Sequence, residues 1–225
     1  MDFDLAVIAD NWRFLAYGVL VTIVLSIVSG ATSLAAGLAL ALLRLRGPRW
    51  LRPLIVLYVD SMRAVPVLVV LVWTFFALPI VTGLTMSPFT AALIGLTVHL
   101  AAYAAEIVRA GIDATPRGQL EAARSLAMTE RQVFLRVVLP PSLGRIWPAM
   151  VSQIVIVMLG SAVCGQIAAQ ELSYSANLIM SRNFRSFEAN FVAAGLYLAM
   201  AVLLRQALAW AGPRWLFGRA APTRS

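Results

Sequence analysis

A few polar side chains inside an apolar segment are the first place where this sequence could do chemistry. His99, Tyr103 and Glu106 recur at intervals of three or four residues, so a helix would place them on one face. Ionisable groups within an apolar span are costly, and they usually line a cavity or pair with a partner. All three are therefore candidates for lining a solute pathway. Glu106 has a second interpretation, a structural ion pair with Arg109.

Other kinds of chemistry are excluded by what the chain lacks. It has one histidine and one cysteine, Cys164, which exclude multi-histidine and cysteine-rich metal sites and an internal disulfide. All 18 basic residues are arginine, so the phosphate-binding loop G-x-x-x-x-G-K-[ST] cannot occur. The sequence offers no paired carboxylates and no nucleophile with its base. We expect a chain that is not an enzyme and that holds neither a metal nor a cofactor itself.

The composition indicates the elements that must position these side chains. The chain is 61% apolar and 12% charged, with a mean hydropathy of +0.85, whereas soluble domains are about 45–50% apolar and about 25% charged. Each apolar run is long enough to cross a bilayer as a helix. The sequence therefore predicts an all-α, polytopic membrane bundle of about five transmembrane helices. The expected spans are 14–43, 54–81, 89–110, 146–167 and 191–211.

The arginines predict how this bundle is oriented. Fourteen of them lie in 44–52, in 109–145 and at the C-terminal end, and three lie on the opposite side. Because cytoplasmic loops carry the excess of Arg, we expect the N-terminus outside and the C-terminus in the cytoplasm. The resulting division is an extracytoplasmic segment 1–13, a transmembrane domain 14–212 with a cytoplasmic loop 111–145, and a cytoplasmic tail 213–225. We expect no nucleic-acid partner.

The loop 111–145 has the pattern of two helices joined by a bend. Residues 119–128 predict a short helix with Leu120, Ala123, Leu126 and Ala127 on one side. Thr129 and Gln132 fit a capping box that starts a second helix, which Leu139–Pro141 should end. Its apolar stripe is Val133, Phe134, Val137 and Val138. Two interfacial helices lying on the lipid, or a docking surface for a cytoplasmic partner, would both fit this pattern.

At this loop the sequence resembles a known family. Glu121–Ala123 (EAA), followed by Val138–Pro140 (VLP), resembles the EAA loop of ABC importer permeases. The runs Ala102–Ile112 (AYAAEIVRAGI) and Pro116–Ala123 (PRGQLEAA) are similar to the polar amino acid permeases of the histidine, glutamine and glutamate type. Two further motifs resemble theirs, RAVP at 63–66 and FRSFE at 184–188.

The resemblance implies a permease subunit of a type I importer in the bacterial inner membrane. It implies a second permease copy or a related permease, a dimer of ABC ATPase subunits that bind ATP and Mg, and an extracytoplasmic solute-binding protein. ATP would drive alternating access through the loop. The coupling residues that it implies are Gly118, Glu121, Ala122, Ala123, Ala127, Leu139 and Pro140.

Two positions depart from the family pattern. Ala127 stands where the family usually has Gly; if that residue is left-handed, alanine costs roughly 1–2 kcal/mol. Leu159–Val163 (LGSAV) stands where the family commonly has Lys-Asp-Thr-Ser-Leu. The loss of this charged pair leads to the hypothesis that a sister permease supplies more of the polar pathway.

Several alternatives stay open at this point. A secondary carrier or channel without ATP coupling, or an ABC permease for another small solute, would also fit an apolar bundle. The segment 171–188, expected outside, is a candidate contact for the binding protein or a solvated loop. The residues do not name the amino acid carried, and they do not distinguish a homodimer from a heterodimer.

Overall fold

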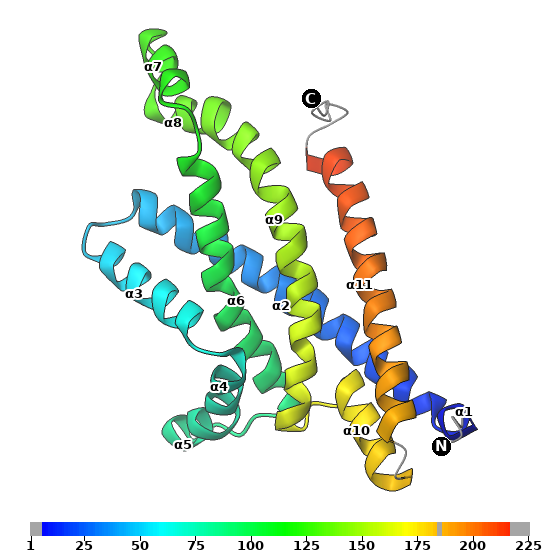
Figure 1. Cartoon of the computed structure of the whole chain (residues 1–225). Coiled ribbons are helices and arrows are strands. Elements are labelled where there is room, and N and C mark those ends of the chain that lie inside the picture. Colours follow the sequence, from blue (N-terminus) through cyan, green and yellow to red (C-terminus); the bar gives the residue numbers. More distant parts are fainter. Residues whose placement is uncertain (1–5, 184–185, 217–225) are drawn as a thin grey trace.

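The computed structural model describes residues 6–183 and 186–216, which form helices joined by short connections (Figure 1). The helices in chain order are α1 Ala6–Asp10, α2 Trp12–Arg46, α3 Leu51–Ala64, α4 Val67–Val72, η1 Trp73–Ala77, α5 Leu78–Thr82, α6 Pro88–Asp113, α7 Arg117–Ser125, α8 Glu130–Gln132, η2 Val133–Val138, α9 Leu139–Gly160, η3 Ser161–Ile167, α10 Leu172–Asn183 and α11 Ser186–Leu216. Residues 1–5 of the predicted N-terminal segment, Phe184 and Arg185 of the FRSFE motif, and residues 217–225 of the predicted tail lie outside the described residues.

Within residues 6–183 and 186–216, four stretches are long and apolar enough to cross a membrane. They are Trp12–Arg46, Pro88–Asp113, Glu130–Ile167 and Phe187–Gly212. Each contains one of the predicted spans or most of it. A fifth crossing would need the bent pair Leu51–Ala64 and Val67–Thr82 to count as one span. The predicted membrane bundle of about five helices agrees with this count.

The predicted second span, 54–81, is not one continuous helix. The helix axis turns by 108° between Ala64 and Val67. Val65 is extended, with φ −89° and ψ 132°, because the ring of Pro66 disfavours the helical region for the residue before it. Pro66 also lacks the N–H that would continue the hydrogen-bond ladder. This segment is therefore two helices at a steep angle.

The prediction that Leu139–Pro141 ends a helix is also wrong, because one helical rod runs from Glu130 to Ile167. Just before the prolines the rod passes through the π-helical turn η2, in which the Leu139 N–H donates to the carbonyl of Phe134. This change of hydrogen-bond register places Pro140 and Pro141 in the first turn of α9. Their missing N–H groups are tolerated there.

Helix α6 lies at the centre of the fold. In the most apolar 18-residue stretch of α6, 61% of the residues are buried, whereas in the corresponding stretch of α11 only 17% are buried. Helix α2 crosses α6 closely at Gly37, where an added Cβ would lie 2.5 Å from the Cβ of Ala104. Small residues at such crossings allow the backbones of membrane helices to approach and gain packing contacts. This close packing gives α6 a defined position between α2 and α9.

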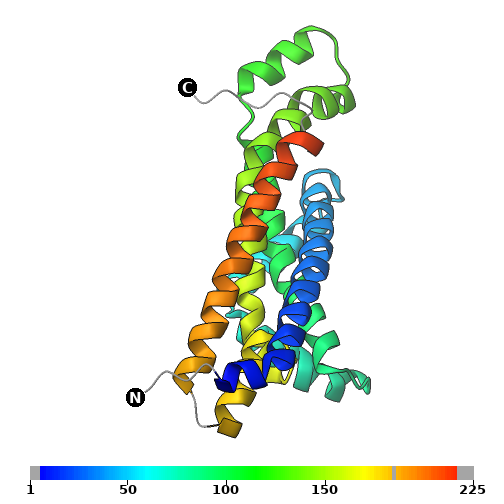
Figure 2. The same ribbon diagram turned by 90° about the vertical axis from the view of Figure 1, so that its right-hand side faces the viewer.

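The two ends of the bundle carry different elements. The α7–α8 segment and the C-terminal end of α11 lie at one end, and α1, α5 and α10 lie at the other (Figures 1 and 2). The helix ends near the α7–α8 end belong to α2, α6, α9 and α11. The residues with candidate chemistry therefore divide between a helical bend beyond α6 and the interior of α6 itself.

Candidate functional site

Residues 116–138 form a bent pair of helices, which we call the elbow. Helix α7 ends in a Schellman motif, in which the Met128 N–H donates to the carbonyl of Ala123 and the Ala127 N–H to that of Arg124. Ala127 occupies the left-handed position of this motif with φ 55°. The bend is therefore not relaxed to suit alanine, and the elbow contains the unfavourable conformation that glycine would avoid.

The second helix of the elbow begins at the predicted capping box. The Thr129 N–H donates to Gln132 Oε1 at 2.8 Å, and the Gln132 N–H donates to Thr129 Oγ1 at 3.4 Å. Across the bend, Arg124 Nε lies 3.0 Å from Glu130 Oε1. The bend is thus held by a cap, a helix-end motif and one exposed ion pair, of which the ion pair contributes least because water screens it.

The elbow has a buried face and an exposed face. Ala123, Val133 and Val138 are buried together against Ile112 of α6, as the predicted stripe requires. Leu126 does not join them: its side chain is 78% exposed, contrary to the expected side of the helix. It lies at the C-cap of α7, where the chain has already begun to turn away from the helical path. With Ala122, it forms an exposed apolar surface on the outside of the bend.

Close contacts join α6 to α9 next to the elbow, and join α2 to the elbow itself. Arg145 Nη1 at the base of α9 donates to the carbonyl of Gly111 at 3.2 Å. Gly111 is required by close packing, because an added Cβ would lie 1.9 Å from a methyl carbon of Ile146. The guanidinium of Arg46, the last residue of α2, lies 4.0 Å from the ring centroid of Phe134. A displacement of the elbow would therefore act directly on α2, α6 and α9.

The remaining predicted coupling residues occupy different environments. Glu121 is exposed in α7, and Gly118 is exposed with nothing within 4 Å of a Cβ added to it. Leu139 is partly buried and Pro140 exposed at the start of α9. The fold brings Gly118, Glu121, Ala122, Ala123 and Ala127 into one elbow and places Leu139 and Pro140 beyond it, in the rod that leads into the bundle.

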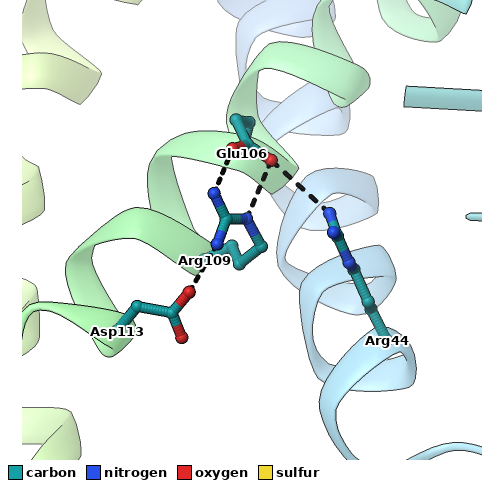
Figure 3. Close-up of polar contacts among 4 residues, drawn as sticks. All are labelled: Arg44, Glu106, Arg109 and Asp113. Atoms are coloured by element: carbon teal, nitrogen blue, oxygen red, sulfur yellow. Dashed lines mark hydrogen bonds and ion pairs between the residues drawn. The ribbon is translucent and has the colours of Figure 1, made fainter. Parts of the chain in front are cut away.

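The polar end of α6 is an ion-pair network. Glu106 pairs with Arg109 through two contacts and lies 3.5 Å from Arg44 of α2. Arg109 in turn pairs with Asp113, so the four side chains form a chain between α2 and the end of α6 (Figure 3). The predicted Glu106–Arg109 pair is confirmed, and Glu106 additionally fastens α6 to α2.

His99 and Tyr103 lie side by side as their spacing predicts. Their ring centroids are 5.3 Å apart, and the Tyr103 hydroxyl donates to the carbonyl of Arg63 at 3.3 Å. His99 is buried, and its Nδ1 has no hydrogen-bond partner in the described part of the chain. A buried polar atom without a partner is uncommon and marks a position where a polar ligand would gain a hydrogen bond. Glu106 lies one turn beyond Tyr103, and its carboxylate already pairs with Arg109 and Arg44.

A buried carboxylate, Glu171, was missed by the sequence analysis. It is completely buried and accepts hydrogen bonds from the N–H groups of Ser173 and Tyr174 at 2.8 and 2.7 Å. It therefore caps α10, and the described residues of the segment 171–188 are mostly helical, not a solvated loop. Burial raises the pKa of this carboxyl above its usual range, although the hydrogen bonds that it accepts act in the opposite direction. An acidic residue directly before a helix start was the one signal available in the sequence.

Known proteins resemble this chain over most of its length. Residues 33–215 match the family described as "Binding-protein-dependent transport system inner membrane component". A probable glutamine ABC transporter permease protein of Bacillus subtilis is 30% identical over 201 residues, which cover 89% of this chain and 93% of that protein. A second one from the same organism is 34% identical over 179 residues, covering 80% of this chain and 82% of that protein.

Solved structures give the same picture of the fold. A chain of a crystal structure described as an amino acid ABC transporter with histidines superposes with a TM-score of 0.88 at 28% identity, covering 95% of this chain and all of that one. A chain of the inward-facing MetNI methionine ABC transporter superposes with a TM-score of 0.73 at 23% identity, covering 93% and 97%. This second likeness concerns the fold alone.

Proposed function

Because the chain belongs to the family of binding-protein-dependent transport system inner membrane components, we propose that it is the transmembrane permease subunit of an ABC importer for polar amino acids. The relatives named as glutamine permeases support this substrate class. A solute-binding protein delivers the amino acid outside, and alternating access carries it across the inner membrane. The permease works with a second copy or a related permease.

The observation that carries this proposal is the elbow. Its inner face is buried against α6, while Leu126 and Ala122 expose an apolar surface on the outside of the bend. A small, exposed apolar surface beside Glu121 suits a cleft in a cytoplasmic ATPase subunit, since alanine allows close approach of the two backbones. A chain without lysine cannot form the phosphate-binding loop G-x-x-x-x-G-K-[ST], which supports the proposal that ATP and Mg are bound by that partner.

The arrangement of the two ends supports the predicted orientation. The elbow and the C-terminal end of α11 lie at the same end (Figures 1 and 2). The ends of α2, α6 and α11, the elbow and the start of α9 carry most of the arginines among the described residues. We place this end in the cytoplasm, with α1 and α10 on the outside, since positive charge is retained on the cytoplasmic side.

The test is reconstitution in liposomes with the ATPase and binding protein of the same transporter. We expect Leu126→Asp to lower ATP-driven glutamine uptake by about tenfold or more, because loss of one buried leucine contact costs at least about 1.4 kcal/mol. The ATPase subunits should also no longer co-purify with this variant. Leu84→Asp is the matched control, because Leu84 is similarly exposed but lies between α5 and α6 at the opposite end. Uptake by the permease alone, insensitive to ATP, would instead assign a secondary carrier or channel.

A further inference from the structure

A basic pocket lies on the inner side of the elbow, and it is separate from the exposed apolar surface of Leu126. Its volume is about 760 Å³, and it is bounded by the end of α2, the end of α6 and both helices of the elbow. Four arginines line it: Arg46, Arg117, Arg124 and Arg131. Glu121, Ala122 and Leu126 are not among its lining residues. The elbow therefore presents two different surfaces to two different environments.

The positive charge of this pocket is largely uncompensated. Of its two acidic lining residues, Asp113 pairs with Arg109 and Glu130 pairs with Arg124. Within residues 6–183 and 186–216, no carboxylate pairs with Arg46, Arg117 or Arg131. Three guanidinium groups with free donors thus face one cavity. Guanidinium groups of this kind bind phosphate oxygens through paired, charge-assisted hydrogen bonds.

One of these arginines is already held in place. The guanidinium of Arg46 lies over the ring of Phe134 at 4.0 Å from its centroid. Stacking on an aromatic face orients the planar group and leaves its edge N–H groups available. A ligand that binds there loses less side-chain entropy than one that must order a free arginine.

The position of the pocket indicates which phosphate it meets. Arg46 and Asp113 are the last residues of α2 and α6, two helices long and apolar enough to cross the membrane, so the pocket lies where both leave it. Apart from Thr115, its remaining lining residues are apolar: Leu45, Ile112, Leu120, Val133, Phe134 and Val138. A lipid headgroup at this level offers both a phosphate and an apolar glycerol region. Basic pockets between membrane helices on the cytoplasmic side are suited to anionic headgroups.

We propose that this pocket binds the phosphate of an anionic phospholipid from the leaflet on the elbow side, with Arg46 and Arg131 as its principal ligands. The bound lipid would connect the end of α2 to the second helix of the elbow, because the two arginines come from these two elements. Its loss would loosen the elbow without removing any protein contact.

The experiment uses the full chain, purified in a neutral detergent and titrated with dihexanoyl phosphatidylglycerol while its thermal unfolding midpoint is followed. Roughly 0.3 M salt limits the contribution of exposed charges. We expect the midpoint to rise with the phosphatidylglycerol concentration and not with dihexanoyl phosphatidylcholine. In R46Q/R131Q the apparent affinity should fall about tenfold or more, as expected for the loss of two charge-assisted hydrogen bonds.

The matched control is R49Q/R136Q. Arg49 and Arg136 are exposed and lie near the same end of the molecule, but neither lines the pocket. This variant loses the same charge and should keep its affinity within about threefold, since exposed charges are screened at this salt concentration. An equal loss in both variants would show a diffuse surface attraction and overturn the proposal.

Two further outcomes would also overturn it. Inorganic phosphate that raises the midpoint as strongly as phosphatidylglycerol would assign the pocket to a free anion. Absence of any lipid effect, with weaker binding of the ATPase subunits by R46Q/R131Q, would assign it to a protein partner. If R46Q/R131Q does not fold, R46K/R131K replaces it, because lysine keeps the charge but not the paired hydrogen bonds; unchanged phosphatidylglycerol affinity in R46K/R131K then counts against the proposal.

Discussion

The hydroxyl of Tyr197 donates a hydrogen bond to Glu171 Oε2 at 2.5 Å, and so joins the cap of α10 to the middle of α11. The same hydroxyl lies 3.1 Å from Ser173 Oγ, and the Leu172 N–H donates to Thr22 Oγ1 of α2 at 3.1 Å. Three helices that are distant in sequence therefore meet at one buried polar cluster. Since the carboxylate accepts all of its hydrogen bonds from within the protein, the cluster should make a measurable contribution to stability.

We expect Glu171→Ala to be strongly destabilising, because it removes the cap of α10 and leaves the Tyr197 hydroxyl without its acceptor. Loss of the cap costs about 0.5–2 kcal/mol and a buried donor left unsatisfied about 1–3 kcal/mol. Tyr197→Phe should cost less, about 1–3 kcal/mol, since the cap survives. Thermal unfolding of the full chain in detergent measures both. Tyr17→Phe is the control at an exposed tyrosine and should leave the midpoint unchanged.

Stability near Glu171 should also depend on pH. Its pKa is raised by burial, so the protonated form is the one that the folded state favours. The contribution is fully present below the ordinary glutamate value of about 4.3 and is lost as pH rises through the higher folded-state value. We therefore expect Glu171→Gln, which stays neutral, to gain stability relative to the parent chain as pH rises across this window.

The titratable groups that face Glu171 are Tyr197 of α11 and Cys164 of η3. Tyrosine and cysteine ordinarily ionise above about pH 8, so neither should produce a slope in this window. Cys164→Ser should accordingly retain the pH dependence of the parent chain. A difference between parent and Glu171→Gln that does not change with pH would contradict the assignment.

The elbow predicts a stabilising substitution. Ala127 has a φ of 55°, and glycine at this position would relieve about 1–2 kcal/mol of left-handed strain. Glycine also gives the unfolded chain more conformational entropy, which lowers the stability of the folded state by about 0.4–1 kcal/mol. The net result expected is a stabilisation of roughly 0.5–1 kcal/mol. Ala122→Gly, inside α7 at an ordinary helical position, should instead destabilise by about 1 kcal/mol. Opposite signs for the two alanines would identify the Schellman motif as the cause; equal signs would reject it.

The buried imidazole of His99 predicts an effect on transport. If its unpaired Nδ1 meets the solute, His99→Ala should change the relative uptake of different amino acids while ATP hydrolysis remains stimulated by the binding protein. The measurement is competition uptake with a panel of polar amino acids in the reconstituted transporter. Tyr58→Phe is a neighbouring control, since Tyr58 donates to the carbonyl of Val98 and leaves the imidazole intact. Unchanged uptake of every amino acid tested would remove His99 from the pathway.

Local rules explain which parts of this molecule could be predicted from its sequence. The capping box at Thr129 and Gln132 and the pairing of Glu106 with Arg109 involve residues three apart, and both are present. Four of the five predicted spans followed from length and hydropathy alone. The prolines could not be interpreted in the same way: Pro66 produced a 108° bend, whereas a π-helical turn carried the helix past Pro140.

The buried polar cluster could not be predicted because its partners are remote. Glu171 and Tyr197 are 26 residues apart, and Thr22 comes from the other end of the chain. The pocket beneath the elbow has the same origin, since Arg46 and Arg131 are brought together only when α2 packs beside α6 and the elbow folds back. Such relationships depend on tertiary packing, which no local pattern encodes.

The unbroken rod from Glu130 to Ile167 has a mechanical consequence. Beyond the elbow, its α9 part has 22 residues and extends for roughly 33 Å at 1.5 Å per residue. A tilt of about 10° where α9 leaves the elbow would displace its far end by roughly 6 Å, about half the diameter of a helix. Small adjustments at one surface of the membrane can therefore open or close a passage at the other.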